Sequence, residues 1–285
     1  MDNFIEKIEQ LVEKYAQLVD LNKFSTCPSF MRRENGCVKC FRYQYRSKEL
    51  VNYNCINKRQ LYIARYLPVH LKEIELGLKG LITENIKQSL LSLPEVNVIS
   101  IGGGPGIDLL ALKKYFIETE TEYHLTKTSR FNLMRWEKIS QWDGMANELI
   151  NVAKSSTYFE FQHKKLHGDI TNNLFWHHVE EKSIHIYLLS YVLSELTKNQ
   201  IEPLKQFIES RANQMVSIVL INDVKNHSLV NSLWNGMRFS NEQCWCGVRY
   251  SVPARNKVAP KQQTGSERYL KVLSFRNFFN LCSNG

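Results

Sequence analysis

A cluster of glycines between residues 102 and 106 constrains the fold of this chain more than any other feature of its sequence. The segment VNVISIGGGPGIDLLALKKYF, residues 96–116, places four glycines and a proline between an apolar, β-branched run and a helix-like run. Glycine adopts positive φ angles without strain and has no Cβ atom, so a ligand or another chain segment can approach its backbone closely. The order of strand, glycine turn and helix therefore predicts a nucleotide-like ligand at the carboxyl end of a strand in an α/β sheet.

Further apolar runs alternate with helix-like segments after this turn. We expect strands over residues 96–101, 130–137, 158–169, 183–192 and 215–224, and a closing hairpin formed by the segments GVRYSVP and RYLKVLSFRNF. Strands that alternate with helices at this spacing form βαβ units and a mainly parallel sheet. The predicted fold class is α/β, with a Rossmann-like, mostly parallel seven-stranded sheet and helices on both of its faces.

The first 93 residues follow a different pattern. Residues 3–20 and 58–93 have helical apolar spacing, and Pro68 is expected to break or restart the second helix. We therefore predict an N-terminal helical, cysteine-bearing region for substrate recognition over residues 1–93 and a ligand-binding domain over residues 94–285. The sequence contains no run of 18 apolar residues, so it predicts no membrane span. The acidic, amphipathic N-terminus resembles neither a secretory signal nor a transit peptide. We therefore expect a cytoplasmic or nuclear protein.

Over residues 94–280 the chain resembles the class I (Rossmann-like) S-adenosylmethionine-dependent methyltransferases. Gly102, Gly104 and Gly106 match the alternate glycines of the family's first motif, whereas Ser100 stands where the family has an acid. The resemblance implies S-adenosylmethionine as cofactor. The residues expected to hold it are Gly102, Gly103, Gly104, Pro105, Gly106, Asp108, Glu137, Asp169, Ile170, Ser190 and Tyr191.

The resemblance also implies roles for the polar residues in this set. Asp108 is expected to compensate in part for the missing acid, Glu137 to bind the ribose hydroxyls, and Asp169 to accept from the adenine amino group. Ile170 is expected to lie against the purine. Ser190 and Tyr191 follow the fourth strand and are expected to form the wall where methyl donor and acceptor meet. Methyl transfer needs mainly alignment of the reacting groups, so the sequence predicts no obligatory catalytic residue.

Other interpretations of the glycine turn are less favoured. A P-loop requires a Lys-Ser/Thr pair that does not follow here. A dinucleotide-dependent oxidoreductase is disfavoured because the fingerprint spacing is poor. A catalytically silent S-adenosylmethionine-binding sensor or scaffold remains an alternative because Ser100 replaces the acid.

Basic residues are concentrated in two segments. Residues 23–72 contain eleven Lys and Arg against two acids, and residues 249–276 contain seven against one. Such segments outside a neutral core suggest an anionic partner, so RNA is the favoured methyl acceptor, with a small molecule or a protein as the alternative. Short segments that resemble methyltransferase-like proteins of mitochondrial small ribosomal subunits add slightly to the RNA interpretation. A solvated basic surface is the simpler explanation.

Four cysteines, Cys27, Cys37, Cys40 and Cys55, lie within the first basic segment. Four thiolates are the number needed for tetrahedral zinc, and the two-residue gap in CVKC lets both sulfurs face one ion. His70 is an alternative ligand. Because the spacing of the other two cysteines is irregular, unliganded cysteines and an iron–sulfur cluster stay open beside structural zinc.

Overall fold

The computed structural model describes residues 2–19, 40–41, 51–123, 129–153, 156, 158–224, 227–235, 237, 242–245, 250–252, 262–264 and 266–275. Its main sheet has the strand order β3-β2-β1-β4-β5-β9-β6. The bounds of these strands in chain order are Glu95–Ile101 for β1, Ser129–Glu137 for β2, Phe159–His167 for β3, Ile186–Ser190 for β4, Val216–Val224 for β5, Glu242–Trp245 for β6 and Ser266–Phe275 for β9.

Five strands of this sheet, β3, β2, β1, β4 and β5, are parallel to their neighbours. At one edge β9 pairs antiparallel with both β5 and β6. The main sheet is thus mostly parallel, as expected, but its parallel part has five strands and not seven, and β9 and β6 extend it in antiparallel pairing. The predicted closing hairpin is also wrong, because β7 (Tyr250–Val252) pairs with β8 (Gln262–Thr264) in a separate two-stranded sheet.

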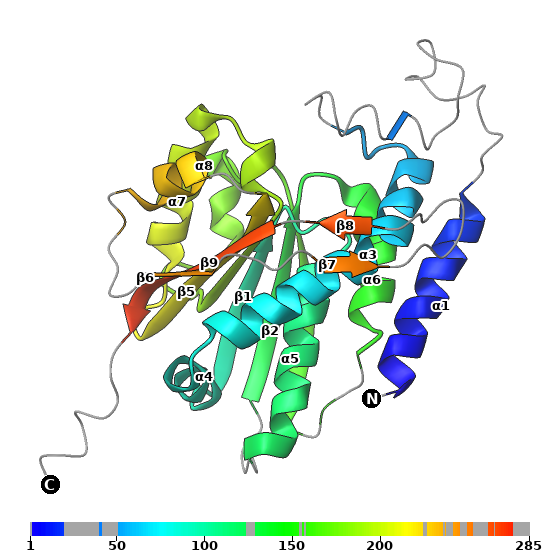
Figure 1. The fold of residues 1–285 in the computed structure, drawn as a ribbon. Coiled ribbons are helices and arrows are strands. Elements are labelled where there is room, and N and C mark those ends of the chain that lie inside the picture. The colour runs from blue at the N-terminus through cyan, green and yellow to red at the C-terminus, as the bar shows by residue number, and fades with distance from the viewer. Residues whose placement is uncertain are drawn as a thin grey trace, which may run out of the picture.

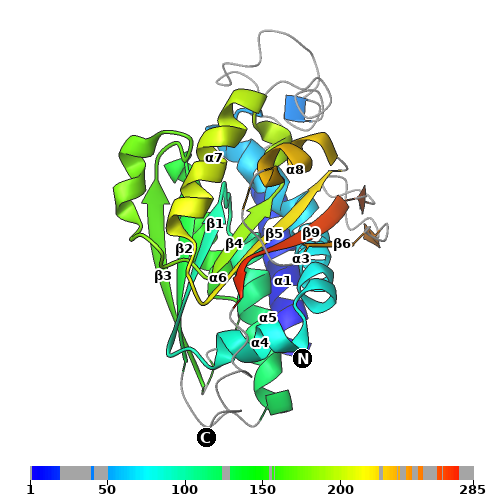
Figure 2. The same cartoon turned by 90° about the vertical axis from the view of Figure 1, so that its left-hand side faces the viewer.

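Helices cover both faces of the main sheet (Figures 1 and 2). One face packs in a single apolar cluster with α1 (Asp2–Leu18), α3 (Ile56–Leu81), α4 (Glu84–Leu91), α5 (Ile107–Tyr123) and α6 (Asp143–Ile150). The opposite face packs against α7 (Lys198–Arg211) and α8 (His227–Trp234). Three short 3-10 helices lie in the connections: η2 (Ser140–Trp142), η3 (Asn173–His178) and η4 (Leu193–Glu195).

Helix α3 continues through Pro68, contrary to the predicted break. Proline inside a helix costs roughly 3 kcal/mol because it lacks the N–H and its ring clashes with the preceding turn. Most residues of α3 are buried, and the helix packs against α1, α5 and β5. Burial on several sides offsets the local cost. No helix in the described part of the chain is both long and apolar enough to cross a bilayer.

Candidate active site at the carboxyl edge of the sheet

The sheet face that packs against α3 and α5 changes from apolar to polar at the carboxyl ends of its strands. Val96 and Val98 of β1 lie in the apolar cluster, and the next residue on that face is Ser100. Likewise, Leu188 of β4 precedes Ser190, and Leu220 of β5 precedes Asn222. Because parallel strands end at one edge, these polar residues gather there, and the register pairs Ser190 with Asn222.

Three of the four glycines in the turn after β1 are required for steric reasons. A Cβ on Gly102 (φ +60°) would stand 2.9 Å from Val192, and one on Gly106 (φ +80°) would stand 3.0 Å from Ile150. A Cβ on Gly103 would meet the Ser100 hydroxyl at 2.4 Å. These three positions are therefore constrained by packing within the protein.

Gly104 differs from the other three glycines. It has φ +45°, and a Cβ placed on it would meet no atom within 4 Å. Its N–H donates to Glu137 Oε2 at 2.8 Å, and its carbonyl accepts from Arg135 Nη1 at 2.8 Å. Glu137 and Arg135 thus fix the turn through its backbone, and the space into which a side chain at position 104 would project is open. A ligand can approach the backbone at this position.

Arg135 supports the turn from beneath. Its side chain is fully buried and pairs with Asp143. Burial lowers the pKa of Arg135, and the carboxylates around it, including Glu137 and Asp108, oppose that shift. No local sequence pattern indicates this residue, because its contact to Gly104 joins positions 31 residues apart.

An acid does reach the position beside Ser100, but it comes from α5. Asp108 is 3% exposed and accepts from the Ser100 hydroxyl at 2.6 Å and from the Leu109 N–H at 2.8 Å. Burial raises its pKa to about 6, against the opposing effect of these hydrogen bonds and of Arg135. The site therefore contains a buried carboxyl group close to the end of β1, as the expectation for Asp108 requires.

Known proteins resemble this chain in fold and not in sequence. No protein-family model and no curated protein matches it. A precorrin-6y C5,15-methyltransferase from Geobacter metallireducens is 9% identical over 66% of this chain and 85% of its own, with a TM-score of 0.39. A SAM-dependent methyltransferase from Methanosarcina mazei is 8% identical over 68% and 99%, with a TM-score of 0.40. A loganic acid methyltransferase with SAH is 14% identical over 57% and 55%, with a TM-score of 0.40.

Likenesses at this distance support no statement about reaction or substrate. The strand order identifies the fold. In the sheet, five parallel strands lie side by side, and β9 lies antiparallel between β5 and β6. The chain has a Rossmann-like, doubly wound α/β fold. In such a doubly wound sheet, ligands bind outside the carboxyl ends at the point where strand order reverses, here between β1 and β4.

At this carboxyl edge, Glu137 is the last residue of β2, and Asp169 follows the end of β3 by two residues. Both oxygens of Glu137 accept from backbone N–H groups, those of Gly104 and Ile139. Asp169 accepts from Thr171 and from Lys138. Burial would raise the pKa of Asp169, but these partners outweigh burial and lower it. Each Glu137 oxygen and Asp169 Oδ2 accept one hydrogen bond and keep a lone pair for a further donor, whereas Asp169 Oδ1 already accepts two.

Ile170 and Pro105 are buried, and Ser190 is half-buried. Ile170 packs in the apolar cluster on the α7 face. Its carbonyl accepts from the Trp176 indole at 2.8 Å. The structure thus places all the predicted cofactor residues at one edge of the sheet. Their roles toward a cofactor stay predictions.

Tyr191 adopts an unusual conformation directly after β4. Its φ is +57°, a left-handed value that is uncommon outside glycine and that clusters at functional sites. Its hydroxyl donates to Glu73 Oε2 at 2.8 Å, and its ring stacks on His70 with centroids 4.3 Å apart. Two residues of α3 therefore fix the position of Tyr191, which the sequence predicts to line the place where methyl donor and acceptor meet. The contact between Glu73 and Tyr191 joins positions 118 residues apart, so no local pattern could reveal it.

His70 has a packing role in the described part of the chain. Its ring stacks between Tyr66 and Tyr191, and its Nδ1 lies 3.2 Å from the Tyr62 hydroxyl. Burial lowers its pKa to about 4, with only partial opposition from Glu73, so the ring is neutral at pH 7. These contacts differ from the zinc ligation that the sequence offered as an alternative for this residue.

The structure describes two of the four cysteines that the sequence offers as zinc ligands. Cys27 and Cys37 lie outside the described residues, while Cys40 and Cys55 are free thiols of intermediate exposure. Among described side chains, no group of three or more His, Cys, Asp or Glu is arranged to hold a metal ion.

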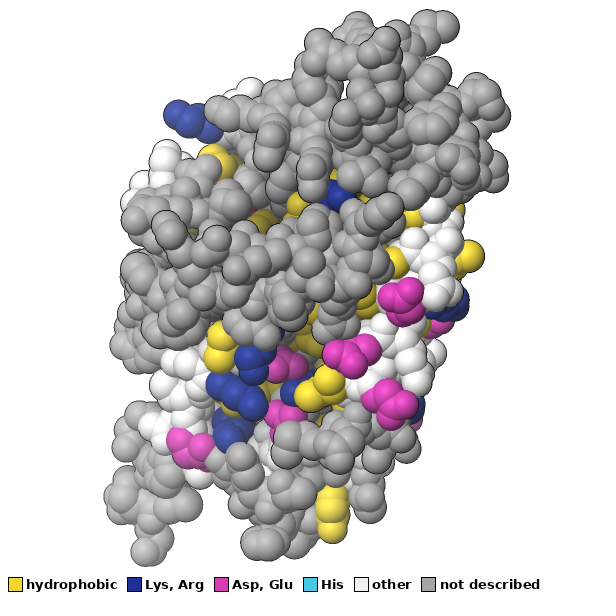
Figure 3. All heavy atoms as spheres, turned by 45° about the vertical axis from the view of Figure 1, so that its right-hand side comes forward, with side chains coloured by type: hydrophobic (Ala, Val, Ile, Leu, Met, Phe, Trp, Pro, Cys, Tyr) yellow, Lys and Arg dark blue, Asp and Glu magenta, His cyan; other side chains and the backbone are white. Residues whose placement is uncertain are grey.

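Three of the four basic residues that the structure describes in the first basic segment are buried. Lys58, Arg59 and Arg65 of α3 are buried, and Arg59 donates to backbone carbonyls of residues 53 and 54. Lys72 pairs with Glu75. On the face seen in Figure 3, the Lys and Arg side chains coloured in the lower half lie beside Asp and Glu, whereas those near the top do not. The described surface on that side carries mixed charge.

Proposed function

We propose that this protein transfers a methyl group from S-adenosylmethionine, bound over the glycine turn between the carboxyl ends of β1 and β4. The observation that carries this proposal is Gly104, whose positive φ and open side offer a ligand direct access to the backbone. The polar groups around it suit the parts of this cofactor, since Asp108 is a carboxyl partner for an ammonium and Glu137 and Asp169 retain acceptor capacity for hydroxyls and an amino group.

When bound, the cofactor supplies an activated methyl group on a sulfonium. The protein's own residues position the cofactor and shield the site. Arg135 and Glu137 fix the glycine turn, and Ser100 orients the Asp108 carboxyl. Tyr191, held by Glu73 and His70, lines the side of the site that faces α3. Alignment of reacting groups is the main contribution that such a site makes to methyl transfer.

Binding measurements test the cofactor assignment. Calorimetry with S-adenosylmethionine, S-adenosylhomocysteine and NAD is expected to detect the first two only. Gly104→Arg places a long side chain in the open space and should abolish binding. Gly144→Arg is the matched control, because a Cβ on this exposed glycine also meets nothing within 4 Å. Binding of NAD alone, or unchanged affinity in Gly104→Arg, contradicts the proposal.

Transfer itself needs a separate assay. Labelled S-adenosylmethionine incubated with pools of RNA, protein and small metabolites identifies the acceptor class. The basic segments of the sequence favour RNA, whereas the burial of Lys58, Arg59 and Arg65 removes part of that argument. Binding of cofactor without labelling of any pool supports the silent sensor or scaffold instead.

Structural zinc on Cys27, Cys37, Cys40 and Cys55 remains part of the proposal for the N-terminal region. Metal analysis of purified protein tests it, with about one equivalent expected. A Cys40→Ser variant should lose the ion, and a Cys244→Ser variant should retain it. Less than about half an equivalent in the wild type contradicts a zinc site.

A further inference from the structure

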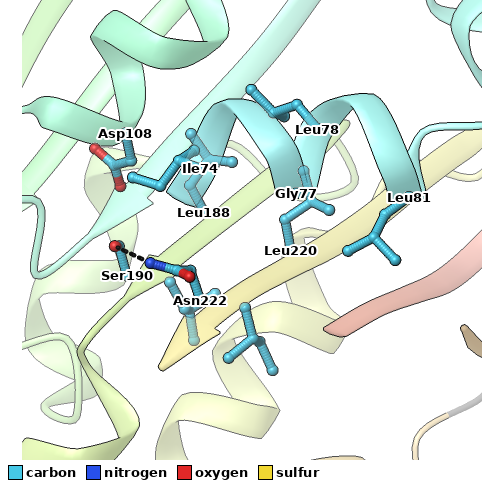
Figure 4. A pocket seen from close by; sticks show the side chains of 11 residues that line it. Ile74, Gly77, Leu78, Leu81, Asp108, Leu188, Ser190, Leu220 and Asn222 are labelled. Atoms are coloured by element: carbon cyan, nitrogen blue, oxygen red, sulfur yellow. Dashed lines mark hydrogen bonds between the residues drawn. The ribbon is translucent and has the colours of Figure 1, made fainter. Parts of the chain in front are cut away.

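A cavity lies between α3 and the carboxyl halves of β4 and β5 (Figure 4). Its empty volume of about 310 Å³ includes space that is open to solvent. Ile74, Leu78 and Leu81 of α3 line one side, and Leu188 and Leu220 of the sheet line the other. An apolar lining with a few polar groups is typical of small-molecule sites.

Three polar residues line the same cavity: Asp108, Ser190 and Asn222. Asn222 is 7% exposed, and its Nδ2 donates to Ser190 Oγ at 3.4 Å. Its Oδ1 is buried and has no hydrogen-bond partner in the described part of the chain. A buried acceptor without a donor is unfavourable, and native proteins rarely leave one unless a ligand or water completes it.

The cavity adjoins the proposed cofactor site through Asp108. That side chain lines the cavity and also accepts from Ser100 beneath the glycine turn. Ser190 links the cavity to Tyr191, the wall residue that follows it. A molecule in the cavity would therefore lie next to a methyl donor held over Gly104, as transfer between adjacent reactants requires.

We propose that this cavity holds the methyl acceptor, and that the acceptor is a small, mainly apolar molecule with an N–H or O–H group that donates to Asn222 Oδ1. This inference rests on the proposed function. In the transfer, a lone pair of the acceptor forms the bond to the methyl carbon, the electron pair of the broken carbon–sulfur bond stays on sulfur, and the acceptor's proton passes to water at the open side.

The cavity chemistry disfavours RNA in this position. No Lys or Arg is among the described residues that line it, and its one ionisable group, Asp108, is acidic. Phosphate recognition depends on Lys, Arg or clustered backbone N–H groups. An apolar molecule with one donor matches the lining, whereas a polyanion does not.

Two probes of the same shape test the recognition by Asn222. Indole carries an N–H donor, and indene lacks it. We expect the full-length wild type, with and without S-adenosylhomocysteine, to bind indole at least about fivefold more tightly than indene, since leaving a buried acceptor unpaired has at least that cost. Asn222→Leu should remove the preference while indene binding is kept. Asn235→Leu, an exposed substitution at the end of α8, should change neither affinity.

A second variant separates loss of recognition from loss of fold. Leu220→Phe narrows the cavity without altering Asn222 and should weaken both probes by a common factor. Equal affinities for indole and indene in the wild type, no binding of either, or a preference that survives in Asn222→Leu overturns the inference.

The labelling assay supplies the last arm of the test. Label in the small-metabolite pool, reduced at least about tenfold in Asn222→Leu, supports the inference, and label in RNA alone overturns it. Failure of S-adenosylhomocysteine to bind contradicts the proposed function. Normal binding of S-adenosylhomocysteine without discrimination between the probes contradicts this inference alone.

Discussion

Replacing Asp108 by asparagine should stabilise the protein at neutral pH while it weakens the cofactor site. The Asp108 carboxyl is 3% exposed, and burial raises its pKa from 3.8 to about 6. In the unfolded chain the ordinary value applies. One pKa unit corresponds to about 1.4 kcal/mol, so ionisation of this group costs the folded state about 3 kcal/mol above pH 6. Asparagine keeps an acceptor for Leu109 and removes that charge.

The pH dependence gives the prediction its sign. Below pH 3.8 the carboxyl is protonated in both folded and unfolded chains, so the cost is absent. Between these pKa values the folded chain binds more protons than the unfolded chain, and the wild type gains stability relative to the variant as pH falls. We expect Asp108→Asn to be more stable by about 3 kcal/mol at pH 8, and the difference to vanish near pH 4.

Urea unfolding of both proteins at pH 8, 6 and 4 measures this difference. Glu209→Gln, an exposed substitution on α7, controls for the removal of one negative charge. A difference that stays constant with pH, or a variant that is less stable at pH 8, would refute the reasoning. It would mean that Ser100 and Arg135 compensate the buried carboxylate fully. A stabilised variant with weaker cofactor binding would be a trade-off between stability and function.

Three further predictions concern the same edge. Affinity for S-adenosylhomocysteine should fall as pH drops below about 6, where Asp108 takes up a proton, and Asp108→Asn should abolish this dependence in calorimetry. Tyr191→Phe removes the donor to the buried Glu73 side chain and should cost about 1.5–3 kcal/mol in urea unfolding. Burial lowers the pKa of His70 from 6.5 to about 4, so the unfolded chain binds a proton that the folded chain refuses, and stability should fall by about 3 kcal/mol between pH 6.5 and 4. His70→Phe keeps a stacked ring and should remove that part of the acid dependence, and an unchanged pH profile would contradict the assignment.

Strands whose signal is local were predictable from the sequence. The apolar runs expected at 96–101 and 130–137 correspond to Glu95–Ile101 and Ser129–Glu137. The edge of the sheet was not predictable, because β9 pairs with β5 and β6, and nothing local distinguishes these partners from β7. The predicted break at Pro68 was wrong for a related reason, because the packing that keeps α3 continuous comes from elements distant in the sequence.

The same distinction applies to the site. The glycine turn and the acids after the second and third strands follow the strand ends, so a pattern of strands and turns locates them. The groups that hold or complement them arise from long-range contacts: Arg135 beneath Gly104, and Glu73 against Tyr191. No local pattern in the sequence indicates Asn222, because its importance depends on the cavity beside it.

Helix α3 connects the choice of acceptor to the cofactor edge. The helix supplies Ile74, Leu78 and Leu81 to the cavity, and one turn earlier it supplies His70 and Glu73 to the clamp on Tyr191. A change on this helix that reshapes the cavity therefore also shifts the wall next to the methyl donor. Acceptor specificity and alignment for transfer would then vary together, because both depend on how one buried helix packs against β4 and β5. Substitutions at Leu78 should accordingly alter the acceptor's kcat and KM together, whereas substitutions at Gly104 should act on cofactor affinity.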